Sequence, residues 1–594
     1  MSFFKTTLAT FVGALLAAML LVTLFFMILI SSSSQPEPFI EDSSILKIEL
    51  TGDIPYRLPH NPFQELIQTG PTLSVQTVQE SLGKAIHDDR IDALWLQVNR
   101  VSGSWASLAE LRESISTFRQ ESGKPVYALT DDIGMNMGGY FLASAADTLV
   151  VPNQTYLELN GFSIQMSFYQ ELFDKIGIEP EITRVGRYKS AVEPFLRQEA
   201  SPEQREQLDA ILDHIHTLFL SEVAESREIS RDQLDSWLGT LPPDPVASAL
   251  ESGLIDRIGY PGDLEMMIRQ QLNLEEDREL PVVSMRRYQR VPSESAGLSS
   301  GEPEGTVAVI HATGMIMPQT IETPFDSQPV ITAKSIAASL ETALENEDVH
   351  SIVIAINSGG GAVSTSELLY ESIRRAAEKK PVIAWFGDVA ASGGYYMGMG
   401  ANEVMATPST ITGSIGIYSM MFNSEELYND HLGIRFETLK THEHADWMRM
   451  TRAQTDTERA AMQQYMQHGY DTFLDRVATN RNRSTEEIHT VAQGRVWTGE
   501  DALDQGLVDR LGSLEDAIAR AAERGGLEVW DTLELPRPKP LFEALFASAE
   551  TSVRSWIRDS IPFAREFSEQ AEPLSILEQP RQLWAILPVD IHVE

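Results

Sequence analysis

The chain contains no cysteine in its 594 residues, which excludes disulfide bonds and thiolate zinc sites. This composition permits an oxidising compartment but does not require one. Basic residues are also scarce, with 46 Lys and Arg against 86 Asp and Glu and a formal net charge of -40. Such a chain cannot neutralise phosphates, so nucleic-acid binding is excluded as its main function. The length and the hydrophobic share of 42% predict a globular protein of about two to four domains.

Charge is absent from one long stretch near the N-terminus, Thr6 to Ile30. These 25 residues would make roughly 38 Å of helix, enough to cross a hydrocarbon core of about 30 Å. The "SSSSQPEP" that follows offers no clear A-x-A cleavage site, so we predict an uncleaved signal anchor, with a cleaved signal peptide as the alternative. Lys5 precedes the stretch and acidic residues follow it, which predicts that the bulk of the chain lies outside the cytoplasm.

An internal repeat organises the rest of the chain. Four pairs of landmark glycines occur in the same order at nearly constant offsets of 253 to 262 residues. They pair Gly52 with Gly314, Gly138 with Gly393, Gly177 with Gly433 and Gly259 with Gly512. The polar stretch 291–305, rich in Gly, Pro and Ser, is predicted to link the two copies. We therefore predict two tandem copies of one fold.

The predicted domain layout has five parts. They are a cytoplasmic stub, anchor and linker at 1–42, the first copy at 43–290, the linker at 291–305, the second copy at 306–535 and a tail at 536–594. Within each copy, short apolar strands alternate with amphipathic helices, which predicts a mostly parallel α/β core. Long covering helices are expected at 201–227 and 455–478. The tail holds apolar pieces that suit core packing or a subunit contact, with membrane-surface contact as the alternative.

Ser392, in "GDVAASGGYY", is placed where a strand-to-helix turn would expose it, and the two glycines that follow let backbone approach closely. A serine hydroxyl is a weak nucleophile unless a neighbouring base removes its proton. The nearest histidines along the chain, His350 and His431, form no local triad with it. An S-G-G sequence taken alone is most often only a tight helix start. A nucleophilic role for Ser392 therefore requires a base from elsewhere in the chain.

Comparison of the two copies supplies a candidate base. The first copy has Met137 where the second has Ser392, and the second has Ala445 at the repeat equivalent of Lys189. One copy has kept the serine and the other the lysine, so we predict a Ser–Lys pair assembled across the two halves. Burial in apolar surroundings would lower the pKa of the lysine from about 10.4 toward neutrality and let its amine act as a base.

Histidine is the rival base, because His442 and His444 fall close to the repeat equivalent of Lys189. The same two histidines with Asp446, and the segment 213–216, are weak metal sites, since each supplies few ligands. Lys189 taken alone has the ordinary interpretation of a solvated surface charge. We expect neither a metal nor a cofactor.

Five motifs, in order and with matching spacing, carry a resemblance to a known family. They are "RVGRYKSAVEPF", "INSGGGAVSTSE", "AASGGYY", "PSTITGSIGIY" and "VAQGRVWTGEDALDQGLVD". From the anchor to about residue 530, the chain resembles the long, two-domain form of the signal peptide peptidase A (protease IV) family, peptidase family S49. The resemblance implies two tandem ClpP/crotonase-like folds of stacked ββα units after an N-terminal transmembrane helix.

The resemblance also implies roles for individual residues. Ser392 would be the nucleophile, Lys189 the general base and Ser414 the hydroxyl that holds the lysine amine in place. Backbone N–H groups of Gly393 and Gly360 would form the oxyanion hole. The family usually has proline where this chain has Gly359, which would loosen the turn that carries one of these donors.

The implied function is a membrane-anchored serine endopeptidase that degrades cleaved signal peptides and other extended apolar peptides. The implied location is the bacterial cytoplasmic membrane, crossed once, with the catalytic body on the periplasmic side, and the implied assembly is a homotetramer. Two other classes remain open, a non-catalytic membrane scaffold and acyl-CoA chemistry on a crotonase-like fold. The complementary loss of serine and lysine argues against both, since neither function needs the pair.

Overall fold

The computed structural model of the chain describes residues 37–58, 73–131, 134–274, 279–298, 301–319 and 329–537, the strand Trp584–Ile586 and the isolated Gly13. Apart from Gly13, the predicted anchor Thr6–Ile30 lies outside these residues. Within the described ranges, no helix combines the length and the apolar character needed to span a membrane.

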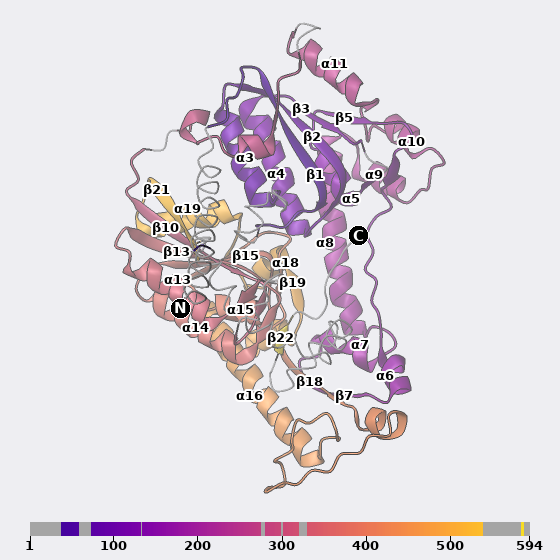
Figure 1. Cartoon of the computed structure of the whole chain (residues 1–594), viewed down its shortest axis with the longest axis vertical. Coiled ribbons are helices and arrows are strands. Elements are labelled where there is room, and N and C mark those ends of the chain that lie inside the picture. The colour runs from indigo at the N-terminus through magenta and orange to yellow at the C-terminus, as the bar shows by residue number, and fades with distance from the viewer. Residues whose placement is uncertain are drawn as a thin grey trace, which may run out of the picture.

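The first half is built on a six-stranded parallel sheet (Figure 1). Its strands in spatial order are β8 (Arg257–Ile258), β5 (Thr148–Val151), β3 (Val126–Leu129), β2 (Ile91–Ser102), β1 (Ser44–Asp53) and β9 (Val282–Ser284). Its helices include α3 (Val75–His87), α4 (Trp105–Ser122), α5 (Met137–Ala143), α8 (Pro202–Ser226), α9 (Arg231–Leu238), α10 (Pro245–Glu251), α11 (Pro261–Gln271) and α12 (Met285–Tyr288). A small separate sheet pairs β4 (Gly134–Asn136) with β6 (Tyr156–Glu158).

The second half repeats this architecture. The corresponding strands in spatial order are β20 (Arg510–Leu511), β16 (Glu403–Ala406), β15 (Val382–Ala391), β13 (Val349–Ser358), β10 (Gly305–Thr313) and β21 (Trp530–Leu535), and β17 (Ile411–Gly413) and β19 (Val496–Thr498) extend the sheet from β15. Its helices are α13 (Ala333–Glu345), α14 (Val363–Ala377), α15 (Gly393–Gly398), α16 (Asp456–Arg481), α17 (Thr485–Val491), α18 (Gly499–Asp504) and α19 (Leu514–Gly525). The six strands follow the same order as those of the first sheet, as two copies of one fold require.

A third sheet contains strands from both halves. Its order is β12 (Val330–Ile331), β11 (Met315–Ile316), β14 (Gly360–Ala362), β22 (Trp584–Ile586), β18 (Ile417–Asn423) and β7 (Glu179–Val185). The strand β7 belongs to the first copy and is flanked by α6 (Gln170–Ile176) and α7 (Glu193–Leu196), yet it pairs with β18 of the second copy. Strand β7 therefore belongs to the first copy in the sequence but lies with the second copy in space.

The two long covering helices form where the sequence predicts them. Ser201 caps α8, its hydroxyl accepting from the Gln204 N–H at 3.1 Å, and Pro202 takes the first helical position. Thr455 and Glu458 form a capping box at the start of α16. The alternation of apolar strands with capped helices confirms the mixed α/β prediction.

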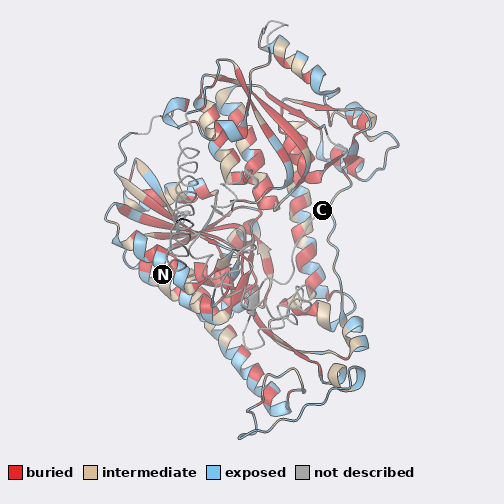
Figure 2. Ribbon diagram, in the orientation of Figure 1, coloured by how far each residue is buried: buried red, intermediate tan, exposed pale blue. Residues whose placement is uncertain are grey.

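The two halves share an apolar core. Val307, Val309 and Trp385 of the second half are buried in the same cluster as the first-half strands β1 and β2. The rings of Tyr56 and Trp385 meet across the junction with centroids 5.1 Å apart. Figure 2 shows the buried strands of both halves, which run through the middle of the molecule. This shared core fixes the orientation of one half on the other.

A buried carboxyl group lies at the same junction. Glu110 of α4 is 6% exposed, and burial raises its pKa to about 8, with the charge of Asp388 on β15 adding to the shift. Asp388 itself accepts hydrogen bonds from Ser107 Oγ at 2.6 Å and Asn357 Nδ2 at 2.9 Å. Glu110 is therefore mainly protonated at neutral pH.

Replacing Glu110 tests this assignment. The pKa of Glu110 is raised in the folded state, so its contribution to stability is lost as pH rises from the usual value of 4.5 through about 8. Glu110→Gln mimics the protonated group, so we expect the variant to unfold near the wild-type temperature at pH 5 and at a higher temperature above pH 8. Glu121→Gln, at an exposed site on the same helix, is the control. Parallel curves of unfolding temperature against pH for Glu110→Gln and wild type would show that Glu110 is ionised in the fold.

Candidate active site

Ser392 lies at the tight turn between β15 and α15. Its φ of 54° and ψ of -112° are costly for a residue with a side chain, by about 1–3 kcal/mol. The two glycines that follow make the turn possible, since a Cβ on Gly393 would lie 2.6 Å from Ser366 Oγ and one on Gly394 would lie 2.5 Å from the Ser358 carbonyl oxygen. The side chain of Ser392 is fully buried. The turn therefore fixes the hydroxyl in a site shielded from bulk water.

Lys189 reaches the second half of the molecule through the strand that the halves share. β7 runs antiparallel to β18, with Glu179 opposite Asn423 and Val185 opposite Ile417. Lys189 follows shortly after this pairing ends. Because the register places Val185 beside the start of β18, the chain enters the second half close to Ser414, three residues before β18 begins.

A close backbone approach holds Lys189 in this position. Gly494 has a φ of 83°, and a Cβ there would lie 2.6 Å from the Lys189 nitrogen and 2.7 Å from its Cα. The N–H of Tyr188 donates to the carbonyl oxygen of Gln493 at 2.9 Å. Gly186, with a φ of 107°, would collide with Gln493 if it carried a side chain. Two glycines thus allow the segments to touch backbone to backbone.

The amine of Lys189 meets three oxygen atoms of the second half. Nζ lies 2.8 Å from Ser392 Oγ, 2.9 Å from Ser414 Oγ and 3.1 Å from the Ser414 carbonyl oxygen, all within hydrogen-bond distance. All three residues are fully buried, and Ser414 also has a positive φ, of 49°. Burial lowers the pKa of Lys189 well below its usual value of 10.5. The surroundings therefore favour an uncharged amine in contact with a serine hydroxyl.

The loop after β13 lies against the turn at Ser392. The nitrogen of Gly361 would lie 3.1 Å from a Cβ on Gly393, and the N–H of Gly360 donates to Ser358 Oγ at 3.1 Å. The N–H of Gly393 belongs to the first turn of α15, where backbone donors have no partner within the helix. Among the described residues Gly359 is not one with a positive φ, so the backbone there is not restricted to glycine.

One strand of the tail lies next to this loop. β22 pairs antiparallel with Gly360–Ala362 of β14 and also with β18 at Tyr418. Of the tail beyond residue 537, the structure describes only this strand. An extended segment therefore occupies the sheet position next to β14, beside the turn at Ser392.

The histidines proposed as a rival base have other partners. His442 Nδ1 lies 2.9 Å from Thr441 Oγ1, and His444 Nδ1 lies 3.1 Å from Glu458 Oε1. In the part of the chain that the structure describes, no hydrogen bond joins either histidine to Ser392. The same described residues contain no group of three or more His, Asp or Glu side chains arranged to hold a metal ion. The geometry thus joins Ser392 to Lys189 and not to histidine.

Comparison with known proteins identifies the family. The model of peptidase family S49 matches residues 118–275 and 374–528, one segment in each half. The chain belongs to peptidase family S49. This S49 chain is 32% identical to the chloroplastic serine protease SPPA of Arabidopsis thaliana, covering 86% of this chain and 74% of that one. It is 33% identical to Protease 4 of Salmonella typhi, covering 82% and 78% of the two chains.

A shorter relative matches part of the S49 chain. The putative signal peptide peptidase SppA of Enterococcus faecium is 30% identical, over 37% of this chain and 64% of that one. Among solved structures, a membrane-bound stomatin-specific protease aligns at 16% identity with a TM-score of 0.25, too low to define a common fold. Family membership makes the protein a serine peptidase, a hydrolase of peptide bonds, in preference to a scaffold or an acyl-CoA enzyme.

Sequence analysis missed the residues that hold Lys189 in place in this S49 peptidase. Gln493 and Gly494 stand in the motif "VAQGRVWTG", but nothing in that stretch indicates contact with Lys189. The available signal was the glycine itself, because an isolated glycine outside a turn sequence often marks close backbone approach. The partner of such an approach is not encoded in the local sequence.

Adding a methyl group at Gly494 tests the close approach. We expect Gly494→Ala to lower kcat/KM roughly 10²-fold, because its Cβ would push the Lys189 backbone away from Ser392. The control is Gly433→Ala, since Gly433 has a similar φ of 68° but no atom within 4 Å of an added Cβ. Equal losses in the two variants would mean that backbone strain, and not displacement of Lys189, explains the effect.

The buried amine also has a measurable effect on stability. Burial lowers the pKa of Lys189 in the fold well below the value of 10.5 that it has in the unfolded chain, so the unfolded state binds the proton more strongly and Lys189 destabilises the fold at neutral pH. The long apolar side chain of Lys189→Met carries no such cost. We expect this variant to unfold at a higher temperature than wild type at pH 7, with the difference shrinking as pH rises toward 10. A difference that stays constant from pH 6 to 10 would contradict the lowered pKa.

Proposed function

We propose that this S49 peptidase is a membrane-anchored endopeptidase in which Ser392 is the nucleophile and Lys189 the general base. The observation that carries the proposal is the 2.8 Å contact between Lys189 Nζ and Ser392 Oγ in a fully buried setting. An uncharged amine at that distance is within reach of the hydroxyl proton. Ser414, through its hydroxyl and its carbonyl oxygen, holds the amine in place.

The reaction has two proton transfers through one amine. Lys189 takes the proton of Ser392 as Oγ attacks the peptide carbonyl carbon, and it returns that proton to the leaving amine as the peptide bond breaks. Water then attacks the acyl-enzyme. Lys189 accepts a proton from the water and passes it to Ser392 Oγ as the acid product leaves. A lowered pKa serves both directions, because the amine must accept and release the proton near neutral pH.

Backbone amides would stabilise the oxyanion. The N–H of Gly393 is positioned for this role by the turn of Ser392, and the second donor comes from the Gly360 loop. The Gly360 N–H donates to Ser358 Oγ, so it would either share this bond or leave the role to its neighbour Gly361. Removing one such donor typically costs about 3–4 kcal/mol of transition-state stabilisation.

Extended apolar peptides are the proposed substrates, with cleaved signal peptides as the main class. The pairing of β22 with β14 supports an extended binding mode, because it places a strand beside the nucleophile turn through main-chain contacts. A substrate in this mode would replace β22. The relative from Enterococcus faecium is named as a signal peptide peptidase, which supports the substrate class.

The proposed location follows from the uncharged stretch Thr6–Ile30. It would cross the bacterial cytoplasmic membrane once as an uncleaved anchor and leave residues 43–535 on the periplasmic side. In this layout the first copy, 43–290, supplies the base and the second, 306–535, the nucleophile. A homotetramer is the assembly that the family resemblance implies.

Single substitutions in the dyad test the proposal. In the full chain in detergent, we expect Ser392→Ala and Lys189→Ala each to lower kcat for an apolar fluorogenic peptide at least about 10⁴-fold. Each substitution removes one of the two groups that exchange the proton. The chemical step is therefore slowed, while KM is expected to change little. The controls are Ser372→Ala, at a half-buried residue of α14, and Lys175→Ala, at an exposed residue, which alter the same residue types outside the dyad.

The pH profile separates the two candidate bases. We expect kcat/KM to rise with pH through the lowered pKa of Lys189 and to level off below the usual lysine value of 10.5. A His442→Ala/His444→Ala double variant should keep both the rate and this rising limb. Full activity in Lys189→Ala together with loss of activity in the double histidine variant would overturn the proposed base.

A further inference from the structure

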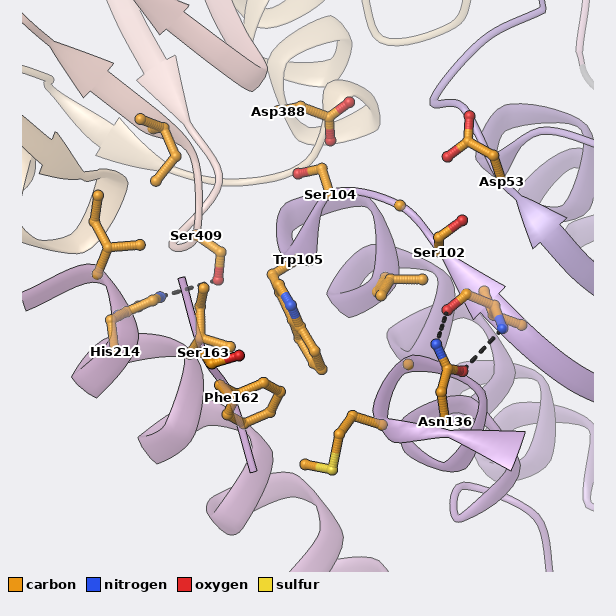
Figure 3. A pocket seen from close by; sticks show the side chains of 18 of the residues that line it. Asp53, Ser102, Ser104, Trp105, Asn136, Phe162, Ser163, His214, Asp388 and Ser409 are labelled. Atoms are coloured by element: carbon orange, nitrogen blue, oxygen red, sulfur yellow. Dashed lines mark hydrogen bonds between the residues drawn. The ribbon is translucent and has the colours of Figure 1, made fainter. Parts of the chain in front are cut away.

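The first half of the molecule contains a cavity of about 750 Å³ that the proposed reaction does not use. One wall is the loop Val101–Ser104 with the start of α5, another is α8, and a third comes from Asp388 and Ser409 of the second half. Figure 3 shows Trp105 in the middle of this cavity, between His214 on one side and Asn136 on the other. A cavity of this size suits a peptide side chain or a small organic group.

The cavity occupies the repeat equivalent of the catalytic cleft. The loop Val101–Ser104 leads from β2 to α4, as the loop with Gly360 leads from β13 to α14. Met137 begins α5 at the position that Ser392 takes before α15. The two sheets share one strand order, so loops after corresponding strands lie at corresponding places.

This first-half cleft lacks a group that the proposed peptide hydrolysis requires. Met137 has no hydroxyl to attack a carbonyl. The side chain of Asn136 accepts from the Val101 N–H at 3.0 Å and from the Gly139 N–H at 3.1 Å, and donates to the Val101 carbonyl oxygen at 2.8 Å. The amide ties the end of β2 to the start of α5. Binding is therefore what the cavity can still offer.

The lining is apolar at the centre, and polar and charged side chains, among them Asp53, Arg100 and Asp388, stand around it. Trp105 and Phe162 meet edge to face with centroids 4.9 Å apart, and Met137 and Ile215 are buried beside them. At the wall, His214 Nε2 lies 3.0 Å from Ser409 Oγ. The centre of the cavity, at Trp105 and Phe162, therefore suits an apolar group.

We propose that this cavity is a second, non-catalytic peptide site that takes an apolar side chain of an extended peptide. The corresponding edge in the second half supports an extended occupant, because Gly360–Ala362 there pairs antiparallel with the strand β22. The apolar floor of Trp105 and Phe162 selects the side chain. The substrate class rests on the proposed function, and the site would hold one part of a long apolar peptide while another part reaches Ser392.

A binding stoichiometry tests the site without using activity. The probe is a fluorescein-labelled nonapeptide of leucine and alanine, titrated onto the full-length Ser392→Ala chain in detergent. We expect two peptides per chain. Ser163→Trp, at an exposed residue that lines the cavity, should weaken one of the two binding events at least tenfold. Ser167→Trp, an exposed position nearby that does not line the cavity, should leave both events unchanged.

A photo-crosslinking peptide, used with a chain whose cavity is unaltered, tests the site even if Ser163→Trp misfolds. A benzophenone on one leucine position of the peptide should cross-link to Met137 or to residues near Phe162 as well as to the catalytic half. One peptide per chain, with cross-links confined to the catalytic half, would overturn the second site. Failure of the proposed function is a separate result, since it would appear as retained hydrolysis by Ser392→Ala whatever the stoichiometry.

Discussion

The structure depends on one contact, the amine of Lys189 held 2.8 Å from the hydroxyl of Ser392 where neither side chain is exposed to solvent. An amine on the surface would stay charged at neutral pH and could not take a proton. Lys189 is fully buried, and the partners of its amine, Ser392 and Ser414, come from the opposite half of the chain. The strand β7 delivers the lysine, and Ser414 receives it with two acceptor oxygens. The shared core of the two halves keeps these groups in register.

Several unfavourable features converge at this contact. Ser392 and Ser414 both have positive φ angles, and a lysine is buried without a carboxylate among the partners of its amine. Strain of this kind costs about 1–3 kcal/mol per residue and persists only where the surroundings over-determine the conformation. Here the surroundings do so through close backbone approach at Gly494 and through seven register pairs between β7 and β18. Stability elsewhere in the fold thus offsets a destabilised reactive site.

The repeat explains how one fold carries two different clefts. In the second half the turn before α15 presents a hydroxyl, and in the first half the corresponding turn presents Met137 and a side-chain amide that ties the loop closed. The first half instead contributes Lys189, through a segment that follows β7 and lies outside the first sheet. In a duplicated chain, each copy can keep one of the two groups that meet at this contact, Lys189 in the first copy and Ser392 in the second. The cleft that lost its hydroxyl keeps its apolar lining.

Much of this protein follows from local patterns in its sequence. Caps such as Ser201 and Thr455 set helix starts, alternating apolar segments set the parallel strands, and glycine landmarks reveal the repeat, because each is a matter of neighbouring residues. The complementary serine and lysine could also be found by aligning the copies. The alignment of the copies does not show how close the serine and lysine lie in space. It also does not show the roles of Gly186, Gln493 and Gly494. Those depend on β7 crossing to pair with β18, and such pairing is fixed by long-range packing and register, which leave no periodic signal in either strand alone.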